Sequence, residues 1–78
     1  MKIEIVTPDT TIYEGEVSLA QLPGIDGSFE ILNNHAPMIA ALKNGKVKVI
    51  DAKKAVLFFE IKGGVMEVLK NRILVLAE

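Results

Sequence analysis

The fold is decided by the stretch Leu22-Pro23-Gly24-Ile25-Asp26-Gly27-Ser28-Phe29-Glu30-Ile31-Leu32-Asn33-Asn34-His35-Ala36-Pro37. It is rich in the residues that β-turns require, because Pro presets φ, Gly supplies positive φ, and Asn or Asp hydrogen-bonds its own backbone. One turn is expected at Pro23-Gly24 and Asp26-Gly27 and a second at Asn33-Asn34, with a short strand, 28–32, between them. The stretch therefore predicts two hairpin turns in an all-β domain.

Outside this stretch, apolar and polar residues alternate with the period of half-buried strands. Strands are expected at 2–7, 11–13, 16–22, 28–32, 38–42, 46–50, 55–62, 65–69 and 72–77. Further turns are expected at Pro8-Asp9, at Asn44-Gly45 (the dipeptide typical of a hairpin), at 51–54, at Gly63-Gly64 and at Lys70-Asn71, with a bulge or bend at Gly15. The sequence predicts an all-β fold, a flattened antiparallel β-sandwich or barrel of about eight to ten short strands, in one domain, 1–78.

Composition narrows the functional classes. The chain has 78 residues, half of them hydrophobic, and no cysteine, so it has no disulfide or thiolate metal site. A formal net charge of -1 argues against a nucleic-acid-binding surface. The lysines that gather in mid-sequence are interpreted as a solvated strand face guarded against edge pairing: Lys43, Lys46, Lys48, Lys53, Lys54 and Lys62. No apolar run approaches the length of a transmembrane helix, so direct membrane insertion is not expected.

Two of the expected strands are apolar on both faces. In the strand 55–62, Leu57 and Phe59 share one face and Val56 and Phe58 lie on the other. A small sandwich buries only one face of each sheet. Strand twist and bulges would rotate some of the second set inward. The alternative is an exposed apolar surface that docks on another subunit, and its candidate residues are Val56, Phe58, Leu74 and Leu76.

The residues of known catalytic sites are scarce in this chain. With no cysteine and one histidine, Cys-His and multi-His sites are excluded. Ser18 or Ser28 would have to pair with His35, and no nucleophile-elbow motif supports that pairing. The loop 24–27 lacks the Lys-Ser/Thr and the following helix of a phosphate-binding loop. No catalytic, cofactor-binding or metal-binding residue is expected, and His35 is interpreted as a turn residue or an interface contact.

Several motifs of the chain occur in the same order in a known family. The segments concerned are 3–8, 22–27, 29–32, 34–39, 41–47, 61–68 and 73–78, and they include Leu-Pro-Gly-x-x-Gly and Asn-His-Ala-Pro-Met-Ile. In the residues of these motifs and in their order, the chain resembles the epsilon subunit of F-type ATP synthases over essentially its whole length. The resemblance implies a non-catalytic central-stalk (rotor) subunit. Such a subunit joins the gamma subunit to the loops of the membrane c-ring and couples proton translocation to ATP synthesis.

The resemblance also assigns roles to individual residues. It places ring contacts at Asp26, Gly27, Ser28 and Glu30, and gamma-subunit contacts at His35, Met38 and Ala40. Many family members have an acidic residue at the position of Ser28, a glycine at that of Glu30 and Pro-Gly at that of Asn33-Asn34.

The resemblance further bears on the length and location of the subunit. The chain stops at Glu78, where the family's carboxyl-terminal helical hairpin would begin. A short form without hairpin inhibition or a hairpin nucleotide site is therefore expected. As part of the complex, it would lie peripherally on the cytoplasmic face of the bacterial inner membrane.

Two alternatives come from other functional classes. A biotinyl or lipoyl carrier domain is also a small all-β unit with a modified lysine at a hairpin tip, and Asp51-Ala52-Lys53-Lys54-Ala55 is such a tip. This chain lacks the Met-Lys-Met flank of those domains. The other alternative is a generic β-sandwich adaptor, for which the surface from Asp26 to Ala40 would have no special role in binding.

Overall fold

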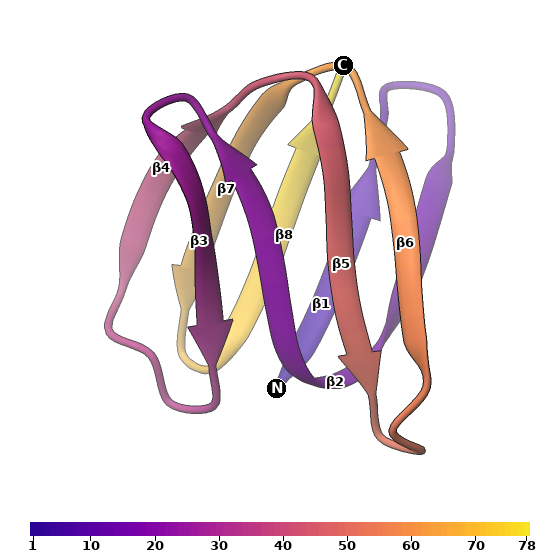
Figure 1. The fold of residues 1–78 in the computed structure, drawn as a ribbon, viewed down its shortest axis with the longest axis vertical. Coiled ribbons are helices and arrows are strands. Elements are labelled where there is room, and N and C mark those ends of the chain that lie inside the picture. The colour runs from indigo at the N-terminus through magenta and orange to yellow at the C-terminus, as the bar shows by residue number, and fades with distance from the viewer.

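The chain folds as a β-sandwich without helices (Figure 1). The computed structural model describes residues 1–78. Its strands are β1 (Lys2–Val6), β2 (Thr11–Gly24), β3 (Gly27–Leu32), β4 (Met38–Leu42), β5 (Gly45–Asp51), β6 (Val56–Ile61), β7 (Gly64–Leu69) and β8 (Arg72–Ala77). The all-β prediction is confirmed, and the number of strands lies at the lower end of the expected range.

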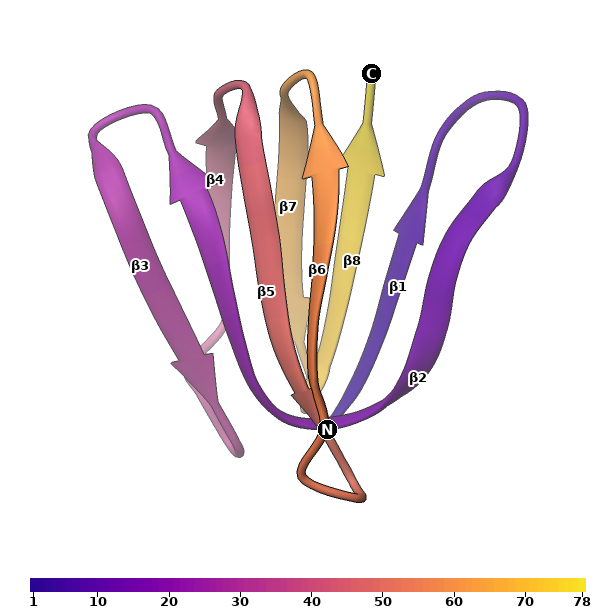
Figure 2. The same cartoon turned by 45° about the vertical axis from the view of Figure 1, so that its right-hand side comes forward.

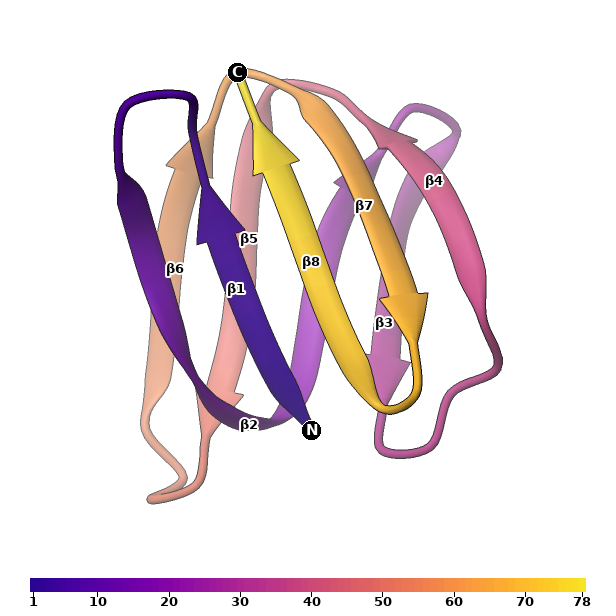
Figure 3. The same ribbon diagram turned by 180° about the vertical axis from the view of Figure 1, so that it is seen from behind.

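The strands form two layers that face each other. The hydrogen-bonded order is β1-β8-β7-β4-β2-β5-β6, with β3 on β2 and a further pairing of β1 with β2. The front layer holds β3, the second half of β2, β5 and β6, and the back layer holds the first half of β2, β1, β8, β7 and β4 (Figures 1 and 3). All pairings are antiparallel except that of β1 with β8, which is parallel.

The long strand β2 belongs to both layers. Glu16 pairs with Lys2 in β1, whereas Leu19 pairs with Ile50 in β5. The register shifts between Val17 and Leu19, as expected where a strand bends through an irregularity from one sheet into another. Figure 2 shows β2 curving from its place beside β1 to its place beside β3 and β5.

The predicted break at Gly15 is wrong. Gly15 pairs with Ile3 in regular register, and the bend comes after Val17. A β-carbon at Gly15 would lie 2.7 Å from the hydroxyl oxygen of Tyr13, so a larger residue there would require the end of that side chain to shift. The Tyr13 ring packs on Phe59 of β6, with ring centroids 4.7 Å apart. This contact joins the back layer to the front layer and closes one side of the sandwich.

Two predicted hairpin turns, at Asn33-Asn34 and Asn44-Gly45, and the predicted turn at Gly63-Gly64 are connections between layers. At Asn33-Asn34 the chain passes from β3, which pairs with β2, to β4, which pairs with β7. Asn44-Gly45 joins β4 to β5, but β4 pairs with β7 and β5 pairs with β2 and β6. Gly63-Gly64 likewise leads from β6 in the front layer to β7 in the back layer. The turn residues marked the ends of the strands correctly. The layer that each next strand joins depends on burial of its apolar face, which the turn residues do not determine.

The predicted turns of two other hairpins, β7–β8 and β5–β6, are confirmed. Lys70 and Asn71 have φ of 52° and 60°, the left-handed pair typical of a two-residue hairpin, and they join β7 to β8. Between β5 and β6, the Asp51 Oδ1 atom accepts hydrogen bonds from the Lys53 and Ala55 amides, both 2.9 Å long. The side chain of Asp51 therefore shapes this tip.

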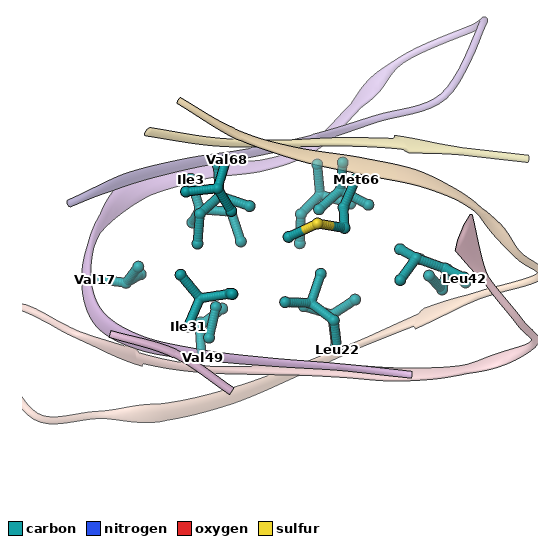
Figure 4. Close-up of a cluster of buried hydrophobic side chains, with 14 of the residues drawn as sticks. Ile3, Val17, Leu22, Ile31, Leu42, Val49, Met66 and Val68 are labelled. Carbon is teal, nitrogen blue, oxygen red and sulfur yellow. The ribbon is translucent and has the colours of Figure 1, made fainter. Parts of the chain in front are cut away.

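The core fills the space between the layers and is wholly apolar. Sixteen hydrophobic residues are buried, and no polar or charged residue is. In Figure 4, Ile3, Met66 and Val68 from the back layer face Leu22, Ile31 and Val49 from the front layer. The inward residues of most strands match the predicted alternation, because side chains on a strand point to opposite faces in turn. In β2 the register shift after Val17 breaks the alternation, so that Ala20 and Leu22 are buried and Leu19 is not.

Phe58 and Phe59 provide a direct test of which face of β6 points inward. Phe58 is 60% exposed, whereas Phe59 packs against the core. Phe58→Ser is expected to change the free energy of unfolding by only about 0.5 kcal/mol. Phe59→Ser is expected to cost about 3 kcal/mol or more, since it removes a packed ring and leaves a cavity. Urea denaturation of both variants checks this. Equal losses would contradict this assignment of the two faces, and a larger loss for Phe58→Ser would show that β6 is turned the other way.

Candidate functional site

One side of the sandwich is left open. On this side β3 pairs only with β2, and β4 touches β2 through the single pair Gly24–Leu42. Between the two strands lies a groove of about 460 Å³. Its lining residues are Gly24, Ile25, Asp26, Gly27, Phe29, Met38, Ile39, Ala40 and Ala41. We call β3, β4 and this groove the open edge; it is opposite the side that Tyr13 and Phe59 close.

The tip of the β2–β3 hairpin forms one end of the open edge. Gly24 pairs with Gly27, so the turn consists of Ile25 and Asp26, and the expected turn at Pro23-Gly24 is part of a strand. A β-carbon on Gly24 would lie 2.6 Å from the carbonyl oxygen of Gly27 and 2.8 Å from the ring of Phe29, so only glycine fits. Gly27 has a φ of 130°, which also favours glycine.

The same tip is tied to the end of β4. The Ile25 amide donates to the carbonyl oxygen of Ala41 over 3.1 Å, and the Lys43 amide donates to that of Pro23 over 2.9 Å. The Ile25 side chain remains 59% exposed. Hydrogen bonds therefore join the two sides of the open edge only at the end where the hairpin tip lies.

The residues for which the resemblance implies ring contacts lie together. Asp26 and Gly27 are exposed at the tip, and Ser28 and Glu30 are exposed on the outer face of β3. Phe29 lies between the latter two and points toward the groove. Ser28 and Glu30 share one strand face, because they are two positions apart, and Asp26 and Gly27 lie at the adjoining turn.

The residues implied for gamma-subunit contact lie farther along the open edge. Met38 and Ala40 are half-buried, pack against the core and line the groove. His35 is exposed in the connection between β3 and β4, with its Nδ1 atom 2.7 Å from the carbonyl oxygen of Ala36. Since β3 rises by roughly 3.4 Å per residue, His35 and the hairpin tip are separated by roughly 17 Å of strand.

This separation bears on catalysis. Ser28 lies near the start of β3, and His35 lies beyond its far end. Ser18 donates to the carbonyl oxygen of Ile50. Neither serine is hydrogen-bonded to His35. Nor does the structure bring three or more His, Asp or Glu side chains into a group that could hold a metal ion. No helix in the structure has the length and apolar character needed to cross a membrane.

The expected docking face of Val56, Phe58, Leu74 and Leu76 is not one surface. Val56 and Phe58 lie outside the front layer, 49% and 60% exposed, whereas Leu76, 52% exposed, and the half-buried Leu74 lie outside the back layer. The sequence shows that β6 and β8 each have a second apolar face. It does not show that the two strands enter opposite layers, so that these faces point in opposite directions.

Pairing across each layer extends these apolar surfaces. In the front layer Val56 pairs with Ile50, Ile50 with Leu19, and Leu19 with Leu32. The back layer carries a similar row, which consists of Val6, Leu76, Val65 and Ala41. Other exposed large hydrophobic residues that were not predicted are Ile25, Ile39 and Leu69. The second-face argument applied to β6 would have found Ile39, because Met38 to Leu42 is apolar throughout.

The lysine-bearing tip at the other end of the molecule is confirmed as a hairpin. Lys53 and Lys54 are both exposed there, and Lys54 has a φ of 67°. The tip lies at the far end of β5 and β6 from the connections that lead to β4 and β7 (Figure 1). It is separate from the open edge.

Comparisons with known proteins identify the family. The model of the ATP synthase delta/epsilon chain β-sandwich domain matches residues 1–78. The ATP synthase epsilon chain of Chlorobium limicola is 44% identical over 77 residues, which are 99% of this chain and 88% of that relative. A chain of the Euglena gracilis mitochondrial ATP synthase (OSCP/F1/c-ring) has the same fold, with a TM-score of 0.88, 18% identity, and coverage of 96% of this chain and 48% of that one. A chain of the Tetrahymena thermophila mitochondrial ATP synthase (central stalk/c-ring) matches with a TM-score of 0.76, 21% identity, and coverage of 97% and 63%. The chain therefore belongs to the family of the ATP synthase delta/epsilon chain β-sandwich domain.

Proposed function

We propose that this chain is the epsilon-type subunit of the central stalk of an F-type ATP synthase. It joins the gamma subunit to the loops of the membrane c-ring, so that rotation driven by proton flow reaches the catalytic part of the complex. The observation that carries the proposal is a family match over all of residues 1–78, together with a relative named as an ATP synthase epsilon chain. The two solved structures with the same fold are chains of mitochondrial ATP synthases, one from an OSCP/F1/c-ring assembly and one from a central stalk/c-ring assembly.

The subunit's part in the complex is non-catalytic. It binds neither cofactor nor metal and transmits torque by contact alone. Its place is on the cytoplasmic face of the bacterial inner membrane, where it is held peripherally through its partners. The carrier-domain alternative is not favoured, because the family match covers Lys53 and Lys54 as part of an epsilon-type sandwich.

The hairpin tip is the proposed contact with the ring. Asp26, Gly27, Ser28 and Glu30 offer exposed backbone, hydroxyl and carboxylate groups that can meet the polar loops of a membrane ring. The two carboxylates lie on different parts of the tip region, Asp26 in the turn and Glu30 on the strand. Together they supply acidic character although Ser28 itself carries no charge.

The proposed contact with the gamma subunit is the rest of the open edge. Met38 and Ala40 offer a half-buried apolar ridge along the groove, and His35 offers an exposed ring at the end of that ridge. Apolar centres bordered by polar groups are typical of protein interfaces. His35 lies at the opposite end of β3 from the hairpin tip, whereas Met38 and Ala40 line the same groove as Asp26 and Gly27, so the two partners would meet along the open edge.

Co-expression with the gamma subunit of the same complex tests this assignment. Size-exclusion chromatography is expected to give a one-to-one complex, and His35→Ala is expected to lower its affinity roughly 5- to 30-fold, the effect of losing an interface residue worth about 1–2 kcal/mol. The melting temperature of the free subunit is expected to stay the same, since His35 is exposed. Lys53→Ala, at the far tip, is the matched control.

The outcomes separate the alternatives. Equal affinities of the His35→Ala variant and the parent chain would remove His35 from the interface. Absence of any complex with gamma would leave the fold assignment standing and favour an adaptor for a different partner. A mass increase of the purified chain on Lys53 or Lys54 would instead indicate a carrier domain.

A further inference from the structure

The sandwich has several strand edges without a partner strand, and one of them differs from the rest. The first half of β2 pairs only with β1, β3 only with β2, and β6 only with β5. Each of these three edges carries acidic residues: Glu14 and Glu16 on β2, Glu30 on β3 and Glu60 on β6. Charges of this kind prevent edge-to-edge association. By contrast, β4 contains no charged residue between Met38 and Leu42, and its outer edge is open along most of its length.

The backbone groups at the edge of β4 can be assigned from the pairing. In an antiparallel ladder, successive residues alternate between bonding to one neighbouring strand and bonding to the other side. The Ala41 carbonyl oxygen accepts from the Ile25 amide, away from β7. Ile39 lies two positions earlier and therefore points its amide and its carbonyl to the same outer side. Neither group has a partner strand there, because β4 pairs with β2 only at Leu42.

The side chains around this edge fit an extended segment. On β4, Met38 and Ala40 face the core and Ile39 faces outward, 72% exposed. A strand laid beside β4 would place alternate side chains beside Met38 and Ala40, in the groove that Phe29 also lines. The side chain opposite Ile39 would pack on its exposed surface. An apolar residue at these positions is therefore favoured.

We propose that the gamma subunit binds by adding a short β-strand to the outer edge of β4, centred on Ile39. The partner segment hydrogen-bonds with the Ile39 amide, the Ile39 carbonyl oxygen and the Ala41 amide, and it places apolar side chains in the groove. Strand addition of this kind takes affinity from main-chain hydrogen bonds and specificity from pockets for alternate side chains. This inference rests on the proposed function, because it concerns how the same partner is recognised.

The structure limits the length of the added strand. At one end the Ala41 carbonyl oxygen is already bonded to Ile25, over 3.1 Å. At the other end Pro37 has no amide hydrogen to donate. The paired segment is thus restricted to the middle of β4.

A pair of variants separates backbone from side-chain recognition. Ile39→Ala removes the exposed side chain and keeps the amide, whereas Ile39→Pro removes both and sets a pyrrolidine ring in the path of an added strand. Proline is tolerated on edge strands where the amide faces away from the sheet. Binding to purified gamma subunit is expected to be at least 10-fold weaker for Ile39→Pro than for Ile39→Ala, with similar melting temperatures of the free subunits.

Hydrogen exchange supplies a readout that needs no variant. The amides of Ile39 and Ala41 are expected to exchange quickly in the free subunit and to become protected in the complex with gamma. If gamma binds but these amides stay unprotected, and the two variants bind equally, strand addition is wrong while the proposed function stands. If gamma does not bind the parent chain, both fail. Should Ile39→Pro not fold, the exchange measurement alone decides.

Discussion

Replacing Gly64 with alanine is expected to leave little folded protein. Gly64 has a φ of 143°, and a β-carbon there would fall on the carbonyl oxygen of Leu76. Positive φ alone costs a non-glycine residue on the order of 1–3 kcal/mol. The clash adds to this cost because Gly64 pairs with both Leu42 and Ala77, so neither neighbouring strand can move away without disrupting the back layer. A chain of this size has a total stability of roughly 4–12 kcal/mol.

Gly27→Ala is the matched control for this experiment. Gly27 has a similar φ, 130°, but a β-carbon there would meet no atom within 4 Å. Its loss of stability is expected to reflect the backbone conformation alone. Circular dichroism and urea denaturation compare the two variants. Identical denaturation midpoints would mean that the back layer adjusts to the extra methyl group at Gly64 without cost.

Leu22→Ala is expected to lower the free energy of unfolding by about 2–5 kcal/mol. Leu22 is fully buried in the second half of β2 and faces the back layer across the core (Figure 4). Removing its branched end loses apolar burial and leaves a cavity between the two layers. The loss is a large part of the stability available to a domain with one small core. Urea denaturation of the variant and of the parent chain measures it.

The control for Leu22 lies on the neighbouring strand. Leu32 of β3 is 54% exposed outside the front layer, so Leu32→Ala is expected to change stability by no more than about 0.5 kcal/mol. Comparable losses for the two leucines would contradict the assignment of inner and outer faces in the front layer.

The two sides of the sandwich differ in a way that suits the proposed role. One side is joined by the packed rings of Tyr13 and Phe59, 4.7 Å apart at their centroids. On the other side β3 and β4 do not pair with each other, and a groove lies between them. A rotor subunit must hold two partners rigidly, and an edge that presents both apolar surface and free backbone groups offers both kinds of contact. The Ile39 variants test the backbone contribution separately.

Some features of the site were predictable from neighbouring residues. The polar character of Ser28 and Glu30 follows from alternation along a single strand, with Phe29 pointing the other way. The groove was not predictable, because its walls come from β3 and β4, which do not pair with each other. The outward direction of the Ile39 amide was not predictable either, since the direction of the backbone hydrogen bonds on β4 depends on the pairing of β4 with β7.

For most strands the sequence by itself determined where they begin and end and which face points inward. The exceptions are β2, which is one long strand, and β6 and β8, which are apolar on both faces. The turns at Asn33-Asn34 and Lys70-Asn71, and the alternation in β1 and β5, follow from residues within a few positions of one another, because backbone conformation and strand period are local properties.

Only the tertiary structure decided which strands are neighbours. It sends β4 and β5 to different layers despite Asn44-Gly45, pairs β1 with β8 in parallel, and turns Phe58 and Leu76 to opposite sides of the molecule. The physical reason is that each strand must bury one face against a layer built from distant segments, and that requirement is met by the whole chain at once.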